Sequence, residues 1–97
     1  MNQFDVYKLS YGDVAVILQN DMFMEFRTRV VVPLIPRSRG KLGTSLNPVL
    51  RYGRRDWVLA TQLMSVVSVT AIKERLGSLA SEDYAIKRAV DQLFLGV

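Results

Sequence analysis

The side chains that could do chemistry in this chain of 97 residues are limited, because the sequence contains neither histidine nor cysteine. Ser-His-Asp triads, Cys-His pairs, histidine-bound zinc and disulfides are therefore excluded. Arg27-Thr28-Arg29 is a cluster whose guanidinium and hydroxyl groups could serve RNA cleavage. No phosphate-binding glycine loop and no acidic pair at catalytic spacing accompanies it. The composition therefore favours a binding protein over an enzyme, and it predicts no cofactor and no metal.

Positive charge is concentrated in the middle of the chain, although the net charge is only +4. Eight basic residues and no acidic residue occur from position 27 to 55, namely Arg27, Arg29, Arg37, Arg39, Lys41, Arg51, Arg54 and Arg55. Arginine suits bidentate contacts with carboxylates or phosphates. This region is either a solvated basic face or a binding site for an acidic protein or a nucleic acid. Arg37, Arg39 and Lys41 are the residues predicted to bind an acidic protein segment.

The apolar pattern predicts short strands followed by one helix. Strands are expected at residues 4–9, 14–18, 29–35, 49–52, 57–61 and 65–70. Pro33 should lie at a sheet edge or a bulge, because proline cannot donate to a strand ladder. Residues 71–79 carry apolar side chains at helical steps and predict one or two helical turns. Five or six short strands are typical of a small barrel or sandwich, here as a single domain over residues 1–97.

Residues 81–97 give the clearest helical signal. Apolar residues recur there at three- and four-residue steps, at Ile86, Ala89, Val90, Leu93, Phe94 and Val97. Ser81 is expected to cap the start of the helix, and Gly96 to end it in the left-handed conformation. The final Leu95-Gly96-Val97 is apolar, whereas chain ends are usually polar and frayed. This end should therefore be either packed inside or offered to a partner.

A second apolar cluster follows the second expected strand. Met22, Phe23, Met24 and Phe26 place four large apolar side chains in five positions. They indicate core or dimer packing, or an exposed contact patch. Together with the apolar C-terminus they predict a homodimer, since such a surface would be large for a monomer. No apolar run reaches membrane-span length and no secretion signal opens the chain, so a cytoplasmic protein without membrane contact is expected.

Several short motifs occur in the order found in the CcdB toxins. They are Gln3-Phe4-x-Val6-Tyr7, Val30-Val31-Val32-Pro33-Leu34, Leu46-Asn47-Pro48-Val49, the hairpin into Trp57, Ile72-x-Glu74, Ile86-Lys87-x-Ala89 and Phe94-x-Gly96. Each motif is weak alone, but their order and spacing resemble that family over essentially the whole chain. The resemblance implies an SH3-like β-barrel with a small accessory sheet and a C-terminal α-helix. It also implies a homodimer that acts as the toxin of a type II toxin–antitoxin system.

The resemblance further implies a target and a way of acting. Members of the family bind the A subunit of DNA gyrase and trap the complex of gyrase with cleaved DNA. They have no catalytic site, meet DNA only through gyrase, and are neutralised by a CcdA-like antitoxin. The implied gyrase-binding residues are Asn20, Met22, Phe23, Asp91, Phe94, Leu95, Gly96 and Val97. Leu95 stands where the family has tryptophan, and Asp91 where it has asparagine, so gyrase poisoning is the property that these departures affect.

Two other interpretations remain open at the level of sequence. The MazF/Kid toxins, which cleave mRNA without the ribosome, share the barrel and have somewhat similar stretches at residues 72–79 and 95–97. Their opening Gly-Asp-Ile/Val-Trp strand is missing here, because Gly12-Asp13-Val14 comes too late in the chain. The third interpretation is a non-toxic CcdB-like relative that only binds an antitoxin.

Overall fold

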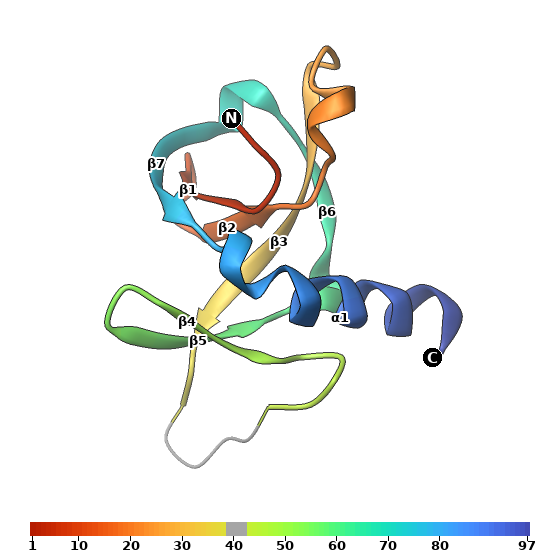
Figure 1. Cartoon of the computed structure of the whole chain (residues 1–97). Helices are drawn as coiled ribbons and strands as arrows, with labels where there is room; N and C mark the ends of the chain where they lie inside the picture. The colour runs from red at the N-terminus through yellow and green to blue at the C-terminus, as the bar shows by residue number, and fades with distance from the viewer. Residues whose placement is uncertain (39–42) are drawn as a thin grey trace.

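The structure is a computed structural model that describes residues 1–38 and 43–97. Within these residues the elements are β1 (Asp5–Leu9), β2 (Val14–Ile17), β3 (Thr28–Pro36), β4 (Val49–Tyr52), β5 (Arg55–Leu59), β6 (Ser65–Ser68), β7 (Ile72–Ser78) and α1 (Asp83–Leu95) (Figure 1). Neighbouring strands are antiparallel and follow the order β4-β5-β3-β2-β1-β7, with β6 paired to β3. The sheet curls into a half-barrel that α1 covers, which confirms the predicted mainly-β class with a C-terminal helix.

Two hydrophobic clusters hold the sheet from the two faces of its central strands. Alternate residues of a strand point to opposite faces, so Val32 and Leu34 of β3 join one cluster while Val31 joins the other. The first cluster includes Ile86 and Ala89 of α1, both completely buried. Complete burial of an isoleucine side chain such as that of Ile86 contributes ~1.5–3 kcal/mol to stability. The first half of α1 is therefore fixed firmly on the sheet.

Strand β3 is central, because it pairs with β2 on one side and with both β6 and β5 on the other. Pro33 consequently lies inside the sheet, and its predicted place at an edge or bulge was wrong. The β6 pairing ends at Val31 and the β5 pairing begins at Leu34, so no strand needs an N–H from Pro33. On that side the Pro33 carbonyl accepts a hydrogen bond from the Ala60 N–H at 3.0 Å.

Strand β7 occupies the segment in which the sequence predicted helical turns. Ile72, Leu76 and Leu79 stand at helical steps, yet the segment pairs with β1 along its length, with two irregularities in register. Pairing with β1 overrides the local helical pattern, as tertiary contacts often do. Ile72 and Leu79 are buried while Leu76 is exposed. The helical prediction was wrong here, and the described residues form seven strands rather than five or six.

The ends of α1 follow the prediction at one end only. The helix begins at Asp83, and Ser81 lies in a preceding 3₁₀ turn, so the predicted Ser81 cap was wrong. The residue before the helix, Glu82, makes no side-chain cap bond, and the Asp83 N–H donates to the Ala80 carbonyl of the preceding turn. Gly96 ends the helix as predicted, with a left-handed φ of 74° and its N–H bonded to the Gln92 carbonyl at 3.0 Å.

The hairpin β4–β5 forms the smaller arm of the structure. Tyr52 pairs with Arg55 across a turn of Gly53 and Arg54, and Gly53 has a φ of 65° that suits glycine. The hairpin joins the main sheet through the end of β3 and extends away from the curled strands (Figure 1). In the part of the chain that is described, no helix is long and apolar enough to cross a membrane.

Candidate functional site

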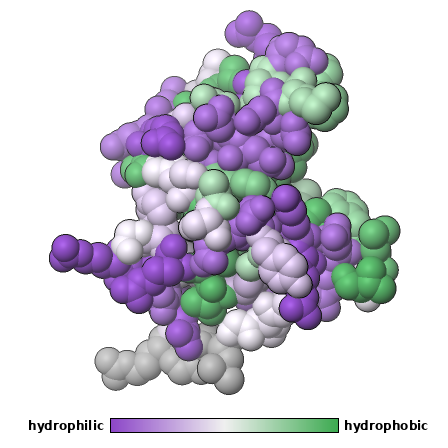
Figure 2. Space-filling model, in the orientation of Figure 1, coloured by the Kyte–Doolittle hydropathy of each residue, from purple (hydrophilic) through white to green (hydrophobic). Residues whose placement is uncertain are grey.

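The last turn of α1 carries apolar side chains into solvent. Phe94, Leu95 and Val97 are 67%, 71% and 82% exposed, respectively. Figure 1 shows the C-terminus extending beyond the strands, and Figure 2 shows hydrophobic residues gathered at that end of the molecule. This apolar end is therefore not packed inside the chain, and contact with a partner stays the prediction for it. We call Phe94, Leu95, Gly96 and Val97 the C-terminal tip.

The second group of predicted gyrase-binding residues lies in a short 3₁₀ turn, Asp21–Phe23, between β2 and β3. The Asn20 side-chain oxygen caps this turn by accepting the Met22 N–H at 2.9 Å. Met22 and Phe23 are 77% and 49% exposed, and Phe26 is also exposed. Core packing is therefore ruled out for these side chains, and a contact with a partner remains as their interpretation.

A buried arginine holds this segment against the sheet. Arg29 is only 7% exposed, and its guanidinium donates to the carbonyls of Thr28 at 2.8 Å, Met24 at 2.9 Å and Phe26. The cluster considered for RNA cleavage is therefore not assembled, because Arg29 points inward while Arg27 and Thr28 are exposed. The alternation of side chains along β3 indicates this arrangement, because Arg29 lies on the same face as the buried Val31, two positions later.

The two groups of predicted gyrase-binding residues are not brought together within one chain. In Figure 1 the turn after β2 stands at the upper right, while the end of α1 lies well below it. Asp91, the remaining predicted residue of this group, lies on α1 and is exposed one turn before the C-terminal tip. The predicted set therefore forms two separate exposed patches on a single chain.

The predicted basic region divides into buried and exposed parts. Arg29 belongs to the interior, whereas Arg37 and Arg51 are exposed beside Asp56. Their guanidinium nitrogens lie 3.5 Å and 3.4 Å from the two oxygens of its carboxylate. Arg39 and Lys41, predicted to bind the antitoxin together with Arg37, lie outside the described residues.

The other face of the hairpin carries a stacked arginine. Arg55 lies over the Trp57 ring, with its guanidinium carbon 5.5 Å from the ring centroid, and Arg54 is exposed in the hairpin turn. Each such contact is worth ~0.5–1 kcal/mol at an exposed site. Apart from Arg27, which is exposed just before β3, the exposed positive charge of the described part of this region gathers on the β4–β5 hairpin and the end of β3.

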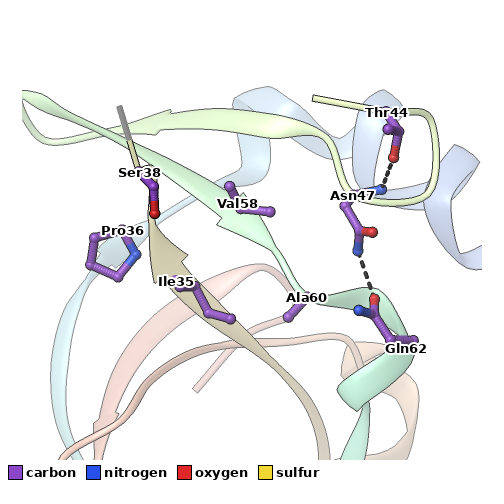
Figure 3. Close-up of a pocket in the computed structure, with 8 residues that line it drawn as sticks. All are labelled: Ile35, Pro36, Ser38, Thr44, Asn47, Val58, Ala60 and Gln62. Atoms are coloured by element: carbon purple, nitrogen blue, oxygen red, sulfur yellow. Dashed lines mark hydrogen bonds between the residues drawn. The ribbon is translucent and has the colours of Figure 1, made fainter. Parts of the chain in front are cut away.

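A cavity opens beside the β4–β5 hairpin (Figure 3). Its volume is about 310 Å³, and its lining residues are Ile35, Pro36, Ser38, Thr44, Asn47, Val58, Ala60 and Gln62. The Asn47 side-chain nitrogen donates to the Gln62 side-chain oxygen at 2.7 Å and to the Leu59 carbonyl at 3.0 Å. The lining thus combines apolar side chains with amides and hydroxyls, and none of the eight residues carries a charge. Sequence reasoning missed this cavity, because its walls come from separate parts of the chain.

The carboxyl group of Asp5 has a structural role. Asp5 of β1 is buried, and Arg75 of β7 contacts both of its oxygens at 3.2 Å. Burial acts to raise the pKa of Asp5, but the hydrogen bonds from Arg75 and the Asn2 N–H hold it below the ordinary value. The pair links the two strands. Among the described residues no three acidic, histidine or cysteine side chains gather into a metal site.

Several solved structures share this fold. An endoribonuclease from Mycobacterial species is 15% identical, has a TM-score of 0.82, and is matched over 100% of this chain and 92% of its own. An endoribonuclease in complex with its cognate antitoxin, also from Mycobacterial species, is 13% identical with a TM-score of 0.80, covering 98% of this chain and 96% of that one. Mycobacterium tuberculosis toxin MazF-mt6 is 16% identical with a TM-score of 0.74, over 93% and 95%. The fold is therefore that of the MazF-like toxins.

Sequence places the chain more narrowly within that class of small barrels. The CcdB protein family matches residues 3–96. The chain belongs to the CcdB family, as the order of its short motifs predicted.

Proposed function

We propose that this chain is the toxin of a type II toxin–antitoxin system and that it poisons DNA gyrase by binding the gyrase A subunit. Binding would trap the complex of gyrase with cleaved DNA, and a CcdA-like antitoxin would neutralise the toxin. The observation that carries the proposal is the C-terminal tip. An apolar tip stands in solvent on a helix whose other half is anchored by Ile86 and Ala89. The resemblance of its motifs to the CcdB family, to which the chain belongs, implies that the contact with gyrase falls at this tip.

The proposed action is binding, without catalysis by the toxin. This is supported by the inward position of Arg29, because the Arg27-Thr28-Arg29 cluster considered for RNA cleavage then has only two of its three side chains exposed. A gyrase poison would act in the cytoplasm and would meet DNA only through gyrase. We also propose a homodimer, because the exposed apolar surface is large for a monomer and a second copy could cover the part of it that includes Phe26, beside the proposed gyrase contacts Met22 and Phe23.

The exposed tip differs from that of the family at two positions that bear on affinity. Truncating a tryptophan at an interface hot spot costs ~2 kcal/mol or more. Leu95 keeps some apolar area but lacks the ring face and the indole N–H. Asp91 adds a charge that must lose water if it meets a neutral surface. We therefore expect weaker poisoning than a Trp-Gly-Ile ending would give.

The experiment compares variants in a DNA-cleavage assay with purified gyrase and supercoiled DNA. We expect low poisoning from the wild type, none after removal of Leu95 to Val97, and a clear gain from Leu95→Trp combined with Asp91→Asn. Tyr84→Ser, which removes an exposed aromatic ring from the opposite end of α1, is the matched control and should leave poisoning unchanged. Poisoning that survives the truncation would remove the C-terminal tip from the mechanism.

The second candidate function is mRNA cleavage of the MazF/Kid kind. The observation in its favour is the fold, which an endoribonuclease shares with a TM-score of 0.82. Cleavage of a labelled RNA by the purified chain, with unchanged activity after loss of the C-terminal tip, would transfer the proposal to this candidate. A CcdB-like relative that only binds an antitoxin would be inactive in both assays, and would remain inactive with Leu95→Trp and Asp91→Asn.

A further inference from the structure

One face of β3, β5 and β4 carries two rows of side chains that lie side by side. The register pairs Val58 with both Ile35 and Val49, and it pairs Asp56 with Arg51, while the Arg37 N–H donates to the Asp56 carbonyl at 3.1 Å. We call Arg37, Asp56 and Arg51 the charged row. We call Ile35, Val58 and Val49 the apolar row. The rows are two residues apart along each strand, so they share one face of the sheet.

The cavity extends from the apolar row. Ile35 and Val58 belong to both, and Figure 3 shows them beside Ala60, with Asn47 and Gln62 across the opening. A volume of about 310 Å³ lies at the small end of the range of ligand pockets, ~300–1,000 Å³. This size and an uncharged lining suit one apolar side chain. The amides of Asn47 and Gln62 can hydrogen-bond a peptide backbone that passes over it.

The charged row has the opposite chemistry. It holds two guanidinium groups and one carboxylate, and its N–O distances of 3.5 and 3.4 Å exceed the ~2.7–2.9 Å of a tight charge-assisted hydrogen bond. The Arg51 side chain is 67% exposed. The Glu82 carboxylate lies at the edge of β4 and accepts the Arg51 N–H at 3.2 Å. A second carboxylate approaching from solvent would be drawn to the exposed guanidinium of Arg51.

The spacing of the two rows matches an extended peptide. Two residues along a strand span ~6.6–6.8 Å, and side chains two positions apart in an extended segment project from one side at the same spacing. We propose that this face binds an extended segment of an acidic protein partner, with one acidic residue over the charged row and an apolar residue two positions away in the cavity. The partner is the antitoxin, so this inference rests on the proposed function.

A nucleic acid fits this face less well. The carboxylate of Asp56 stands between the two arginines and would repel a phosphate backbone that runs along the row. The lining of the cavity carries no cationic side chain for a phosphate, and Trp57, the aromatic ring that could stack on a base, points to the other face under Arg55. Nucleic-acid binding is therefore the competing outcome of the test.

The test is a titration of the isotopically labelled full-length chain, followed by NMR, with capped synthetic peptides in a Gly-Ser background. One peptide carries Glu-x-Leu, a second Gln-x-Leu and a third Glu-x-x-Leu. With Glu-x-Leu we expect shifts of the side-chain amides of Asn47 and Gln62 and of the Val58 backbone amide. Its affinity should exceed that of each other peptide by about three- to fivefold, the scale of a partly exposed ion pair.

Variants locate the contact. Arg51→Gln should remove the advantage of Glu-x-Leu over Gln-x-Leu while leaving the affinity for Gln-x-Leu unchanged. Lys87→Gln is the matched control, because Lys87 is an equally exposed cation that pairs with Asp83 at 3.4 Å on α1. It should change neither affinity. Both replaced side chains are on the surface, so the variants should fold as the wild type does.

Three results would overturn the inference. They are the absence of shifts at millimolar peptide, equal affinity for Glu-x-Leu and Glu-x-x-Leu, and shifts of the same amides by a short DNA duplex that displaces the peptide. The proposed function is tested separately in the gyrase assay. Peptide binding without poisoning would contradict the toxin function alone, and poisoning without peptide binding would contradict this inference alone.

Discussion

Replacing Arg29 with methionine should release the segment between β2 and β3 while leaving the sheet folded. In the native chain the Arg29 guanidinium donates to the carbonyls of Met24, Phe26 and Thr28. Methionine keeps an apolar stem of similar length but has no donor. The three carbonyls would lose their partner at once, and the apolar side chains carried by this segment would lose their fixed position.

The magnitude follows from opposing contributions. Hydrogen bonds that involve a charged group contribute ~1.5–3 kcal/mol each, but the buried guanidinium also costs several kcal/mol of lost hydration. The freed carbonyls lie near the surface, where water can replace the lost donor. We therefore expect the free energy of unfolding to fall by about 2 kcal/mol. For a domain of this size the corresponding drop in Tm is ~8–16 °C.

Two measurements separate a local effect from a general one. Urea denaturation gives the change in stability, and amide hydrogen exchange shows where protection is lost. The Phe23 N–H, which bonds to the Asn20 carbonyl at 3.0 Å, should exchange much faster, while amides of β2 and β3 that lie away from the segment should change little. Arg27→Met is the control and should stay within ~0.5 kcal/mol of the wild type, because Arg27 is exposed.

Either of two outcomes would refute this reasoning. One is an Arg29→Met chain with the wild-type Tm and unchanged exchange at Phe23, which would mean that the guanidinium does not hold the segment. The other is equal loss of protection throughout the sheet, which would mean that Arg29 acts as a core residue. If Met22 and Phe23 contact gyrase, the variant should also poison gyrase less at a temperature where it remains folded.

Three further predictions test other parts of the molecule. Asp5→Asn should lower the urea midpoint at neutral pH and flatten its fall in acid, because Arg75 outweighs burial and keeps the folded pKa of Asp5 low; this contribution is present above about pH 4 and lost as the pH falls further. Ile86→Ala should cost ~2–5 kcal/mol in urea denaturation, whereas Phe94→Ala should stay within ~0.5 kcal/mol yet reduce gyrase poisoning. Gly96→Ala should cost ~1–2 kcal/mol of left-handed strain or fray the last turn, which circular dichroism and exchange at the helix end would detect.

The strands were predictable where the local pattern and the tertiary partner agree. Residues 14–18 and 30–35 are apolar and mostly β-branched, and both ranges lie mainly in strands, β2 and β3, whose central residues are buried. The segment at 71–79 failed, because its apolar spacing is helical and only the pairing with β1 makes it a strand. Pro33 failed for a related reason. The missing N–H of a proline matters only if a neighbouring strand would accept from it. On one side of β3 the pairing partner changes from β6 to β5 around Pro33, and a local sequence pattern cannot show where such a change occurs.

The candidate site was predictable in its residues and only partly in its arrangement. The apolar character of the C-terminal tip is written in the sequence, but its exposure depends on how far α1 extends past the sheet. The inward position of Arg29 could have been inferred from its alternation with Val31, had its charge not suggested the surface. The cavity could not have been found, because Ile35, Asn47 and Val58 meet only through the register of three strands.

The two apolar patches share one structural feature, and this feature affects how the proposed function could change. Each patch is carried by a short segment whose own contacts with the sheet come from other residues: Arg29 holds the turn with Met22, and Ile86 holds the helix with Leu95. Side chains in the patches contribute little to stability, because they bury little surface within the chain. Substitutions such as leucine for the family's tryptophan can therefore accumulate at position 95 without unfolding the protein. The fold can thus remain that of the CcdB family while the strength, or the identity, of the contact changes.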